Sequence, residues 1–267
     1  MPDYQESIRN ELHKIEQEEQ VRILFACESG SRAWGFPSKD SDYDVRFLYI
    51  RQPSWYLSIF EKRDVIERPI SNMLDVNGWD LKKALQLFRK SNPPLLEWLH
   101  SPIQYEEKYS IAEKLRQLAV HTFSPKSCLY HYLNMARGNY RDYLMGDQVR
   151  IKKYFYVLRP ILACCWIEKF DSMPPVEFER LVEVFVSDSC ELKPVIESLL
   201  ARKKAGDELD YEPKIEPIHV FLEERIHYFE AITGTIAQKS VHVDVDEQLD
   251  QLFLEALQEV WAIEQNR

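Results

Sequence analysis

The chain has 267 residues, of which 45% are hydrophobic and 29% are charged, and its formal net charge is −10. This length allows one large domain or two modest domains with a sizeable core. The negative charge argues against a protein that coats nucleic acid non-specifically, because such binding depends on Lys and Arg neutralising phosphates. A local basic groove is still compatible with it.

The cysteines are odd in number and form no Cys-x-x-Cys pair, so we expect free thiols in a reducing compartment. They are Cys27, Cys128, Cys164, Cys165 and Cys190. The polar, acidic N-terminal residues do not have the pattern of a signal peptide. The longest apolar run, Val157 to Ile167, is too short to cross a bilayer. We therefore expect a cytoplasmic protein with no membrane partner.

The first 105 residues mix strand and helix patterns. A helix is predicted over residues 3–19, where apolar residues recur at helical spacing. Gly78 is taken to end the strand pattern, and the two prolines at 93 and 94 end the helix that follows. Strands are predicted at 21–27, 42–50, 64–67 and 72–76, and helices at 79–90 and 95–99.

From residue 106 onward the apolar residues follow helical spacing only. Helices are predicted over 111–120, 127–145, 149–170, 175–186, 192–204, 217–233 and 247–264. We interpret this half as an all-helical bundle. The predicted fold is therefore α+β, with a mixed-sheet domain over residues 1–105 and a helical domain over residues 106–267.

The strongest candidate functional motifs lie in one stretch, residues 28–50. A Gly30-Ser31 pair follows the first predicted strand, and Asp42-Tyr43-Asp44 opens the second. Residues i and i+2 of a strand share a face, so Asp42 and Asp44 would present two carboxylates side by side, and hard oxygen ligands suit Mg²⁺. A helix start after Gly30-Ser31 would aim free N–H groups at an anion. The alternative is a surface loop in which Ser41 and Asp42 only cap a turn.

The same motifs support a family resemblance. Gly-Ser, a following Gly35 and Ser-Asp-x-Asp at the start of a strand resemble the fingerprint of the DNA polymerase beta-like nucleotidyltransferase superfamily. Within it, the chain resembles the RlaP or YcgL-like predicted nucleotidyltransferases. The motifs that carry this are Gly30-Ser-Arg-Ala-Trp-Gly-Phe, Ser41-Asp-Tyr-Asp-Val-Arg46, Gly78-Trp-Asp-Leu-Lys-Lys-Ala-Leu85, Lys90-Ser-Asn-Pro and Leu96-Glu-Trp-Leu99.

The resemblance implies a mixed sheet with helices and three carboxylates that bind two Mg²⁺ ions, with Mn²⁺ as the alternative. By position, Asp42 and Asp44 are two of the metal ligands and catalytic residues. Asp75 is our choice for the third, because it would arrive from a neighbouring strand. Asp80 is the rival, although a place in the first turn of a helix also gives it a purely structural role. Glu67 is a weaker candidate.

The nucleotide is expected to contact both halves of the chain. Gly30 and Ser31 would hold the β- and γ-phosphates, with Arg32 and Lys39 nearby, although a solvated loop cation is the simpler interpretation of each of the last two. In the helical half, the resemblance nominates Arg137, Lys152 and Lys153, with Tyr140 as a base-stacking platform. Lys152, Tyr156 and Arg159 would share one helix face. The alternative is the charged outer face of a bundle.

The predicted activity is transfer of a nucleoside monophosphate from an NTP, with ATP preferred, to a hydroxyl acceptor, releasing pyrophosphate. The acceptor is open among an RNA end, a protein hydroxyl and a small molecule; the RlaP resemblance favours RNA. Two alternatives are a nucleotide-binding regulatory module without transfer activity and an antitoxin-like partner of another protein.

Overall fold

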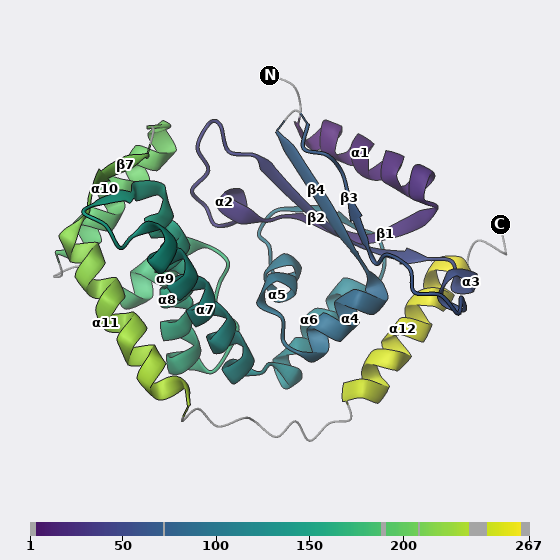
Figure 1. Cartoon of the computed structure of the whole chain (residues 1–267). Coiled ribbons are helices and arrows are strands. Elements are labelled where there is room, and N and C mark those ends of the chain that lie inside the picture. Colours follow the sequence, from purple (N-terminus) through teal and green to yellow (C-terminus); the bar gives the residue numbers. More distant parts are fainter. Residues whose placement is uncertain (1–3, 72, 188–190, 208, 235–244, 263–267) are drawn as a thin grey trace. The chain divides into compact units, whose positions relative to one another are not determined.

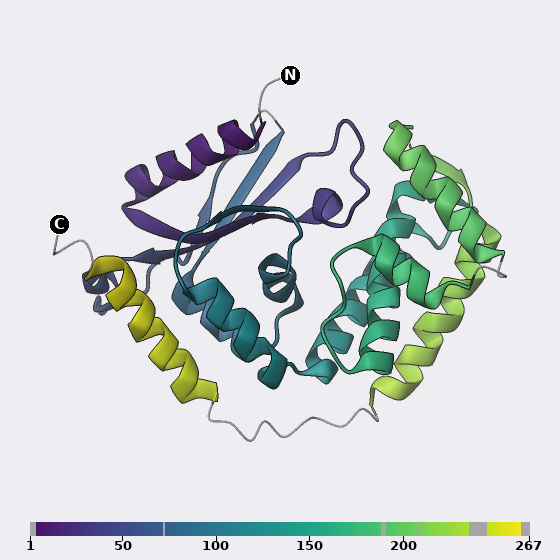
Figure 2. The ribbon, with the colours of Figure 1, turned by 180° about the vertical axis from the view of Figure 1, so that it is seen from behind.

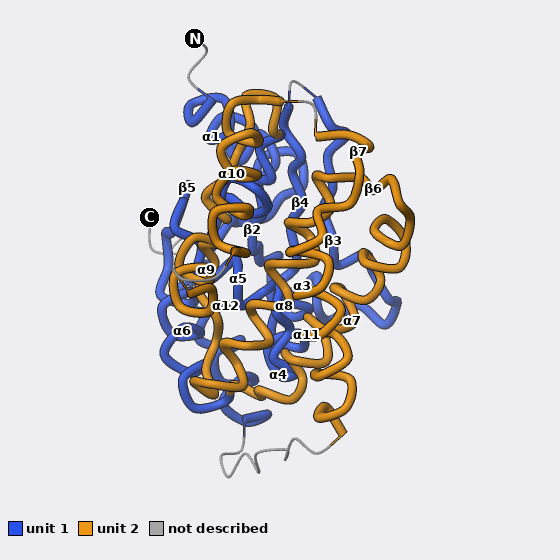
Figure 3. The backbone as a smooth tube through the Cα atoms, turned by 90° about the vertical axis from the view of Figure 1, so that its left-hand side faces the viewer, with its two compact units in different colours: residues 1–33, 42–122, 241–267 blue, residues 34–41, 123–240 orange. Residues whose placement is uncertain are grey.

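The computed structural model describes residues 4–71, 73–187, 191–207, 209–234 and 245–262. It divides into two compact units, coloured separately in Figure 3. Unit 1 comprises residues 1–33, 42–122 and 241–267, and unit 2 comprises residues 34–41 and 123–240. This division differs from the single boundary predicted after residue 105. Each unit is described by itself below.

A five-stranded mixed sheet forms the centre of unit 1 (Figure 1). Its strand order is β3-β4-β2-β1-β5. Strands β2 and β4 run parallel, and the other neighbouring pairs are antiparallel. The strands are β1 Val21–Glu28, β2 Tyr43–Arg51, β3 Val65–Glu67, β4 Leu74–Asp80 and β5 Gln104–Glu107.

Both faces of this sheet are covered. Ile8, Leu12 and Ile15 of α1 pack in one cluster with Val45 and Phe47 of β2, so alternate residues of β2 face α1. Figure 2 shows α1 in purple along this face and other helices on the opposite face. The helices of unit 1 are α1 Tyr4–Glu19, α2 Gly30–Ala33, α3 Pro53–Tyr56, α4 Leu81–Arg89, α5 Pro93–Leu99, α6 Ile111–Thr122 and α12 Val245–Trp261.

The C-terminal helix α12 belongs to unit 1 because polar contacts tie it to α6 and to the residue before that helix. Glu255 accepts a hydrogen bond from Lys114 at 2.8 Å. Glu259 accepts one from the Ser110 hydroxyl at 2.6 Å. Neither contact follows from hydrophobic spacing, which is why a boundary read from that spacing alone separated α6 and α12 from the sheet.

Unit 2 is mainly helical but also contains a small antiparallel sheet formed by β6 and β7. Residues 34–41 belong to this unit because Phe36 is buried there, with its ring centre 4.8 Å from that of Phe155. The elements are α7 Pro125–Tyr143, β6 Gln148–Arg150, the 3₁₀ helix η1 Ile151–Tyr154, α8 Phe155–Phe170, α9 Phe178–Phe185, α10 Leu192–Ala205, β7 Tyr211–Pro213 and α11 Glu216–Thr233.

The α+β fold predicted from sequence is confirmed, but β5 was not among the predicted strands, and there are two further local corrections. β4 continues through Gly78 to Asp80, whereas we expected it to end before Gly78. A Cβ atom at Gly78 would lie 2.2 Å from the Phe47 ring, so the glycine accommodates a large neighbour instead of ending the strand. The second correction is β6–β7, which interrupts the predicted all-helical half.

Four of the five cysteines, Cys27, Cys128, Cys164 and Cys165, are buried and free, as expected, and Cys190 lies outside the described residues. No helix among the described residues is both long and apolar enough to span a membrane.

Candidate active site

The sheet of unit 1 brings two of the predicted carboxylates together. β2 and β4 are parallel, and their register places Asp44 directly beside Asp75. Val45 and Val76 face α1, so Asp44 and Asp75 lie on the opposite face of the sheet. A carboxylate arriving from a strand adjacent to the Asp42–Asp44 segment is what the sequence led us to expect.

Gly30 packs directly against this pair. Its φ of +58° is in the left-handed region that favours glycine. A Cβ atom at this position would lie 2.0 Å from an Oδ atom of Asp44, which leaves no room for any side chain. The Gly-Ser turn and the Asp-x-Asp strand are therefore in contact, and the glycine is required by both its backbone and its neighbour.

Glu28, at the end of β1, holds the backbone of Asp44 in place. Its carboxylate is fully buried and accepts a hydrogen bond from the Asp44 N–H at 2.8 Å. The Tyr105 hydroxyl donates to its other oxygen. Burial raises the pKa of Glu28 to about 7, against the opposing effect of the Tyr105 hydrogen bond. The Ser29 N–H also donates to the Asp44 carbonyl at 2.8 Å, so the turn and the strand are joined twice.

Arg46 binds both carboxylates, and the sequence motifs alone did not identify it as a site residue. One guanidinium nitrogen lies 3.1 Å from Asp44 Oδ1 and 2.8 Å from Asp75 Oδ2. Another donates to the Asp75 carbonyl at 2.8 Å. The spacing Asp-x-Arg on a strand was the available signal, because it places Arg46 on the same face as Asp44.

The electrostatics of Asp44 reflect this crowding. Burial raises its pKa most, Arg46 opposes that effect, and the nearby Asp75 and Asp42 raise the pKa further. Like charges at close range disfavour ionisation of Asp44. A second cation near Asp44 and Asp75 would therefore be favoured electrostatically.

Three carboxylates form a donor set whose chemistry suits Mg²⁺ or Mn²⁺. Asp44 and Asp75 are register neighbours, and the exposed Asp42 lies just before β2. As the side chains stand, Asp44 and Asp75 are turned to Arg46, and within the described ranges no group of three or more His, Cys, Asp or Glu forms a metal-type cluster. Carboxylate oxygens are ligands of the kind that Mg²⁺ prefers, but as they stand these three described side chains do not form a metal site.

The two rival carboxylates have other partners. Asp80 caps α4 by accepting a hydrogen bond from the Lys82 N–H at 2.9 Å. Its other oxygen accepts one from the Tyr56 hydroxyl at 2.8 Å, and burial raises its pKa to about 6. Glu67 pairs with Arg63. Of the three candidates, Asp75 is the one beside Asp44.

Two cations, Arg32 and Lys39, follow the Gly30-Ser31 turn in the sequence, and their surroundings differ. Arg32 donates from Nε to the Asp42 carbonyl at 3.1 Å, and its guanidinium carbon lies 3.7 Å from the centre of the Tyr43 ring. Ser31 is in the first turn of α2. Lys39 is exposed and belongs to unit 2. Arg32 is thus fixed beside Asp42, as a group that contacts a ligand there must be.

The remaining predicted residues lie in unit 2. Lys152 and Lys153 are in η1, a separate 3₁₀ turn before α8, so they do not share one α-helix with Tyr156 and Arg159 as predicted. Lys153 lies over the rings of Tyr143 and Tyr156, with its Nζ 4.2 and 4.7 Å from their centres.

Arg137 and Tyr140 are engaged within unit 2 as well. Arg137 pairs with Glu230 at 2.6 Å. Tyr140 is only 8% exposed, and its hydroxyl hydrogen-bonds to Glu223 and His219, both at 2.7 Å. A base-stacking platform needs an open ring face, and the burial of Tyr140 gives that prediction no support.

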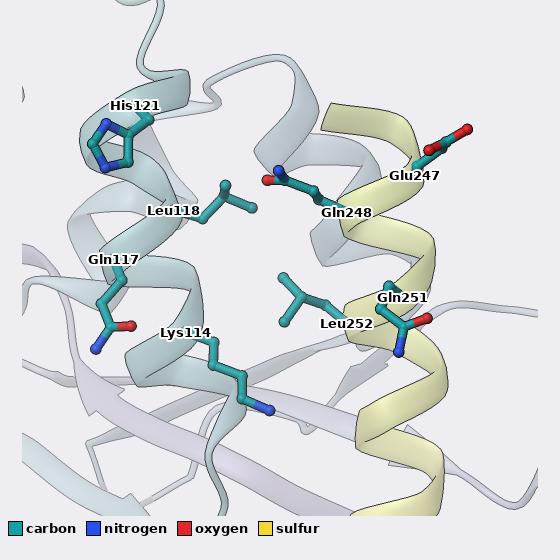
Figure 4. Close-up of a pocket in the computed structure, with 8 residues that line it drawn as sticks. All are labelled: Lys114, Gln117, Leu118, His121, Glu247, Gln248, Gln251 and Leu252. Atoms are coloured by element: carbon teal, nitrogen blue, oxygen red, sulfur yellow. The ribbon is translucent and has the colours of Figure 1, made fainter. Parts of the chain in front are cut away.

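Two cavities have none of the candidate-site carboxylates in their lining. Figure 4 shows the one between α6 and α12, which has a volume of about 700 Å³ and contains none of the predicted residues. In the figure Leu118 and Leu252 point toward one another, among the polar side chains of Lys114, Gln117, His121, Glu247, Gln248 and Gln251. A cavity of about 490 Å³ in unit 2 includes Arg137 and Tyr140 in its lining.

A mixed sheet that carries a Gly-Ser turn against carboxylates from adjacent strands is the arrangement expected of a polymerase beta-like nucleotidyltransferase. Comparison with known proteins agrees. The family model RlaP, described as "RNA repair pathway DNA polymerase beta family", matches residues 4–255. The chain belongs to this family.

Two individual proteins are also similar. The uncharacterized protein YcgL of Bacillus subtilis (strain 168) is 53% identical over 255 residues, which cover 95% of this chain and 96% of that protein. A crystal structure of a nucleotidyltransferase-like protein from Exiguobacterium sibiricum 255-15 matches with a TM-score of 0.30 and 17% identity, covering 83% of this chain and 75% of that one.

Proposed function

We propose that this chain is a Mg²⁺-dependent nucleotidyltransferase that moves a nucleoside monophosphate from an NTP, with ATP preferred, to a hydroxyl acceptor. The observation that carries the proposal is the register of Asp44 beside Asp75, with Gly30 packed against the pair. Membership of the RlaP family supports nucleotidyl transfer as the reaction class.

Asp42, Asp44 and Asp75 would hold the two ions. When bound, the ions supply charge neutralisation at the triphosphate and lower the pKa of the attacking hydroxyl. Arg46 has a positioning role in this proposal, since it holds the Asp44 and Asp75 side chains together while they carry no ion. Glu28 keeps the backbone of Asp44 at a fixed distance from the turn.

The residues of the chain would act on substrate as follows. Backbone N–H groups at Gly30 and the Ser31 hydroxyl bind phosphate oxygens, and Arg32 adds a positive charge beside them. The acceptor oxygen forms a bond to the α-phosphorus while the bond from that phosphorus to the bridging oxygen breaks. Pyrophosphate leaves with that oxygen, and Asp75 accepts the hydroxyl proton.

RNA is the acceptor that the family description favours, since it places the family in RNA repair. The test is to incubate the protein with Mg²⁺, α-labelled NTPs and fractionated RNA, protein and small molecules, and to find which fraction takes up label. Asp42→Asn and Asp44→Asn should abolish labelling. Asp40→Asn is the matched control, because Asp40 is exposed and lies just before this segment. Equal labelling by all variants would contradict the proposal.

A nucleotide-binding module without transfer activity is the second candidate, and the Arg46 ion pairs favour it. One guanidinium balances part of the charge of the carboxylate pair without a metal. This candidate predicts that ATP binds in a calorimetric titration without Mg²⁺, equally well to wild type and Asp44→Asn, and that no pyrophosphate is released. An antitoxin-like role would instead give a stoichiometric protein partner on purification.

A further inference from the structure

The last turn of α10 carries three consecutive cations whose surroundings differ. Arg202 pairs with Glu212 at 3.0 Å, and Lys204 pairs with Glu179 at 2.5 Å. Lys203, between them, has no hydrogen-bond or ion-pair partner for its ammonium group in the described part of the chain. The one cation without a counterion is also the buried one.

Lys203 is only 4% exposed. Its Nζ atom lies 5.7 Å from the centre of the Phe36 ring, and Phe36 is itself fully packed between Phe155 and Phe178. Burial of most of the Lys203 side chain disfavours its charged form, because less water solvates the ammonium group. A lysine needed only for its apolar stem would place its head in water, as Lys204 does.

A second cation lies nearby. Backbone hydrogen bonds from Ile151 to Asp210 and from Lys152 to Leu209 tie η1 to the segment that follows α10. Lys152 is exposed and close enough to contribute, after burial, to lowering the pKa of Lys203 to about 8. Lys152 also has no ion-pair partner among the described residues.

Two further cations extend this environment. Burial, Arg150 and Lys152 together lower the pKa of Lys153. Neither Arg150 nor Lys153 has a carboxylate partner within the described ranges. Among the described residues, four neighbouring cations of unit 2 therefore have no carboxylate partner, although the net charge of the chain is −10. Their mutual repulsion is relieved by an anion of more than one charge.

We propose that Lys203 and Lys152 form a binding site for a phosphoryl group in unit 2. A terminal phosphate carries up to two negative charges and enough acceptor oxygens for two ammonium groups. The triphosphate of a nucleotide and the 5′-phosphate of an RNA end share this chemistry. This inference rests on the proposed function only in its choice of a nucleotide and an RNA end as the two sources of the phosphoryl group.

The test uses the full-length protein and isothermal titration with inorganic tripolyphosphate, ATP, and an oligoribonucleotide with either a 5′-phosphate or a 5′-hydroxyl. Lys203→Met keeps the apolar stem and removes the charge, and Lys204→Met is the matched control one residue along. We expect Lys203→Met to weaken tripolyphosphate binding at least tenfold and Lys204→Met to leave it unchanged. Loss with ATP assigns the nucleotide as the source, and loss confined to the phosphorylated RNA assigns the acceptor.

Wild-type affinity of Lys203→Met for tripolyphosphate, ATP and the 5′-phosphorylated RNA would overturn the site. Thermal unfolding supplies a second readout: tripolyphosphate should raise the melting temperature of wild type and not that of Lys203→Met. If Lys203→Met does not fold, Lys152→Met tests the same site from an exposed position. These titrations measure binding without turnover, so they test the phosphoryl site even if the chain proves to have no transfer activity.

Discussion

The two aspartates of β4 show how one residue type takes two roles on one strand. Asp75 and Asp80 are five residues apart, so they project from opposite faces of the strand. Asp75 has a side chain that is 32% exposed and pairs with Arg46 beside a second carboxylate. Asp80 is 1% exposed and is satisfied by the Lys82 N–H and the Tyr56 hydroxyl.

The difference lies in what each carboxylate leaves free. Both carboxylate oxygens of Asp80 accept hydrogen bonds from other groups of the protein. This suits a helix cap and leaves neither oxygen free for a ligand. The side chain of Asp75 is partly exposed, and its negative charge adds to that of Asp44. Substitutions around the two aspartates can break or sharpen this contrast, beginning with the change of largest expected effect.

Asp44→Asn should lower nucleotidyl transfer by about 10³-fold, because one ligand charge is lost where the transferring phosphate carries its charge. The fold should persist, since the amide still accepts a hydrogen bond from Arg46. Pyrophosphate release and thermal unfolding, measured on the same preparation, check both parts. A variant that is folded and fully active would remove Asp44 from the site.

Gly30→Ala should lower transfer by about 10²-fold through displacement of the Asp44 carboxylate, since small misplacements of catalytic groups are costly. The left-handed backbone at this position adds about 1–2 kcal/mol of destabilisation. Gly35→Ala, also at positive φ but with no atom within 4 Å of the added Cβ, is the control for strain alone. Equal activity losses in the two variants would show that contact with Asp44 is unimportant.

Asp80→Ala should destabilise the protein by about 1–3 kcal/mol, because the cap of α4 is lost and the Tyr56 hydroxyl loses its acceptor. Urea unfolding measures this effect, and activity per folded molecule should be unchanged. Lys83→Ala, which removes an exposed ion pair to Asp64, is the control and should cost less than about 1 kcal/mol. A stable but inactive Asp80→Ala protein would give Asp80 the role assigned to Asp75.

The last prediction concerns pH. Burial raises the pKa of Glu28 to about 7 from an ordinary 4.5, so the folded state holds a proton that the unfolded state releases in this range. Glu28 should therefore make the protein less stable as pH rises from 4.5 to 7. Glu28→Gln should flatten that part of the stability profile in urea unfolding at several pH values. An unchanged slope would contradict the raised pKa.

Much of unit 1 could be predicted because local sequence patterns specify its helices and strands. The apolar run that starts at Val21 and the Asp-x-Asp opening of the second strand predicted the bounds of β1 and β2 to within one residue. The end of β4 was not predictable, since it depends on Phe47 packing over Gly78 from another strand. Local propensity cannot report such a contact.

The candidate site divides in the same way. The placement of Asp75 beside Asp44 followed from the expectation of adjacent strands, and the register bears it out. The pairing of Arg46 and the burial of Tyr140 and Lys203 depend on tertiary packing between distant segments. The family resemblance made Tyr140 a candidate for contact with the base, and only its neighbours in the fold show that it is buried.

The most direct test of the central claim compares Asp75→Asn with Asp80→Asn, two isosteric changes on one strand. Pyrophosphate release from Mg²⁺ and ATP is measured with the acceptor fraction present and is expressed per folded molecule. We expect a loss of about 10³-fold for Asp75→Asn and near wild-type release for Asp80→Asn, whose amide oxygen still accepts the capping hydrogen bond. Equal activity of the two variants, or loss in Asp80→Asn alone, would contradict the assignment of Asp75.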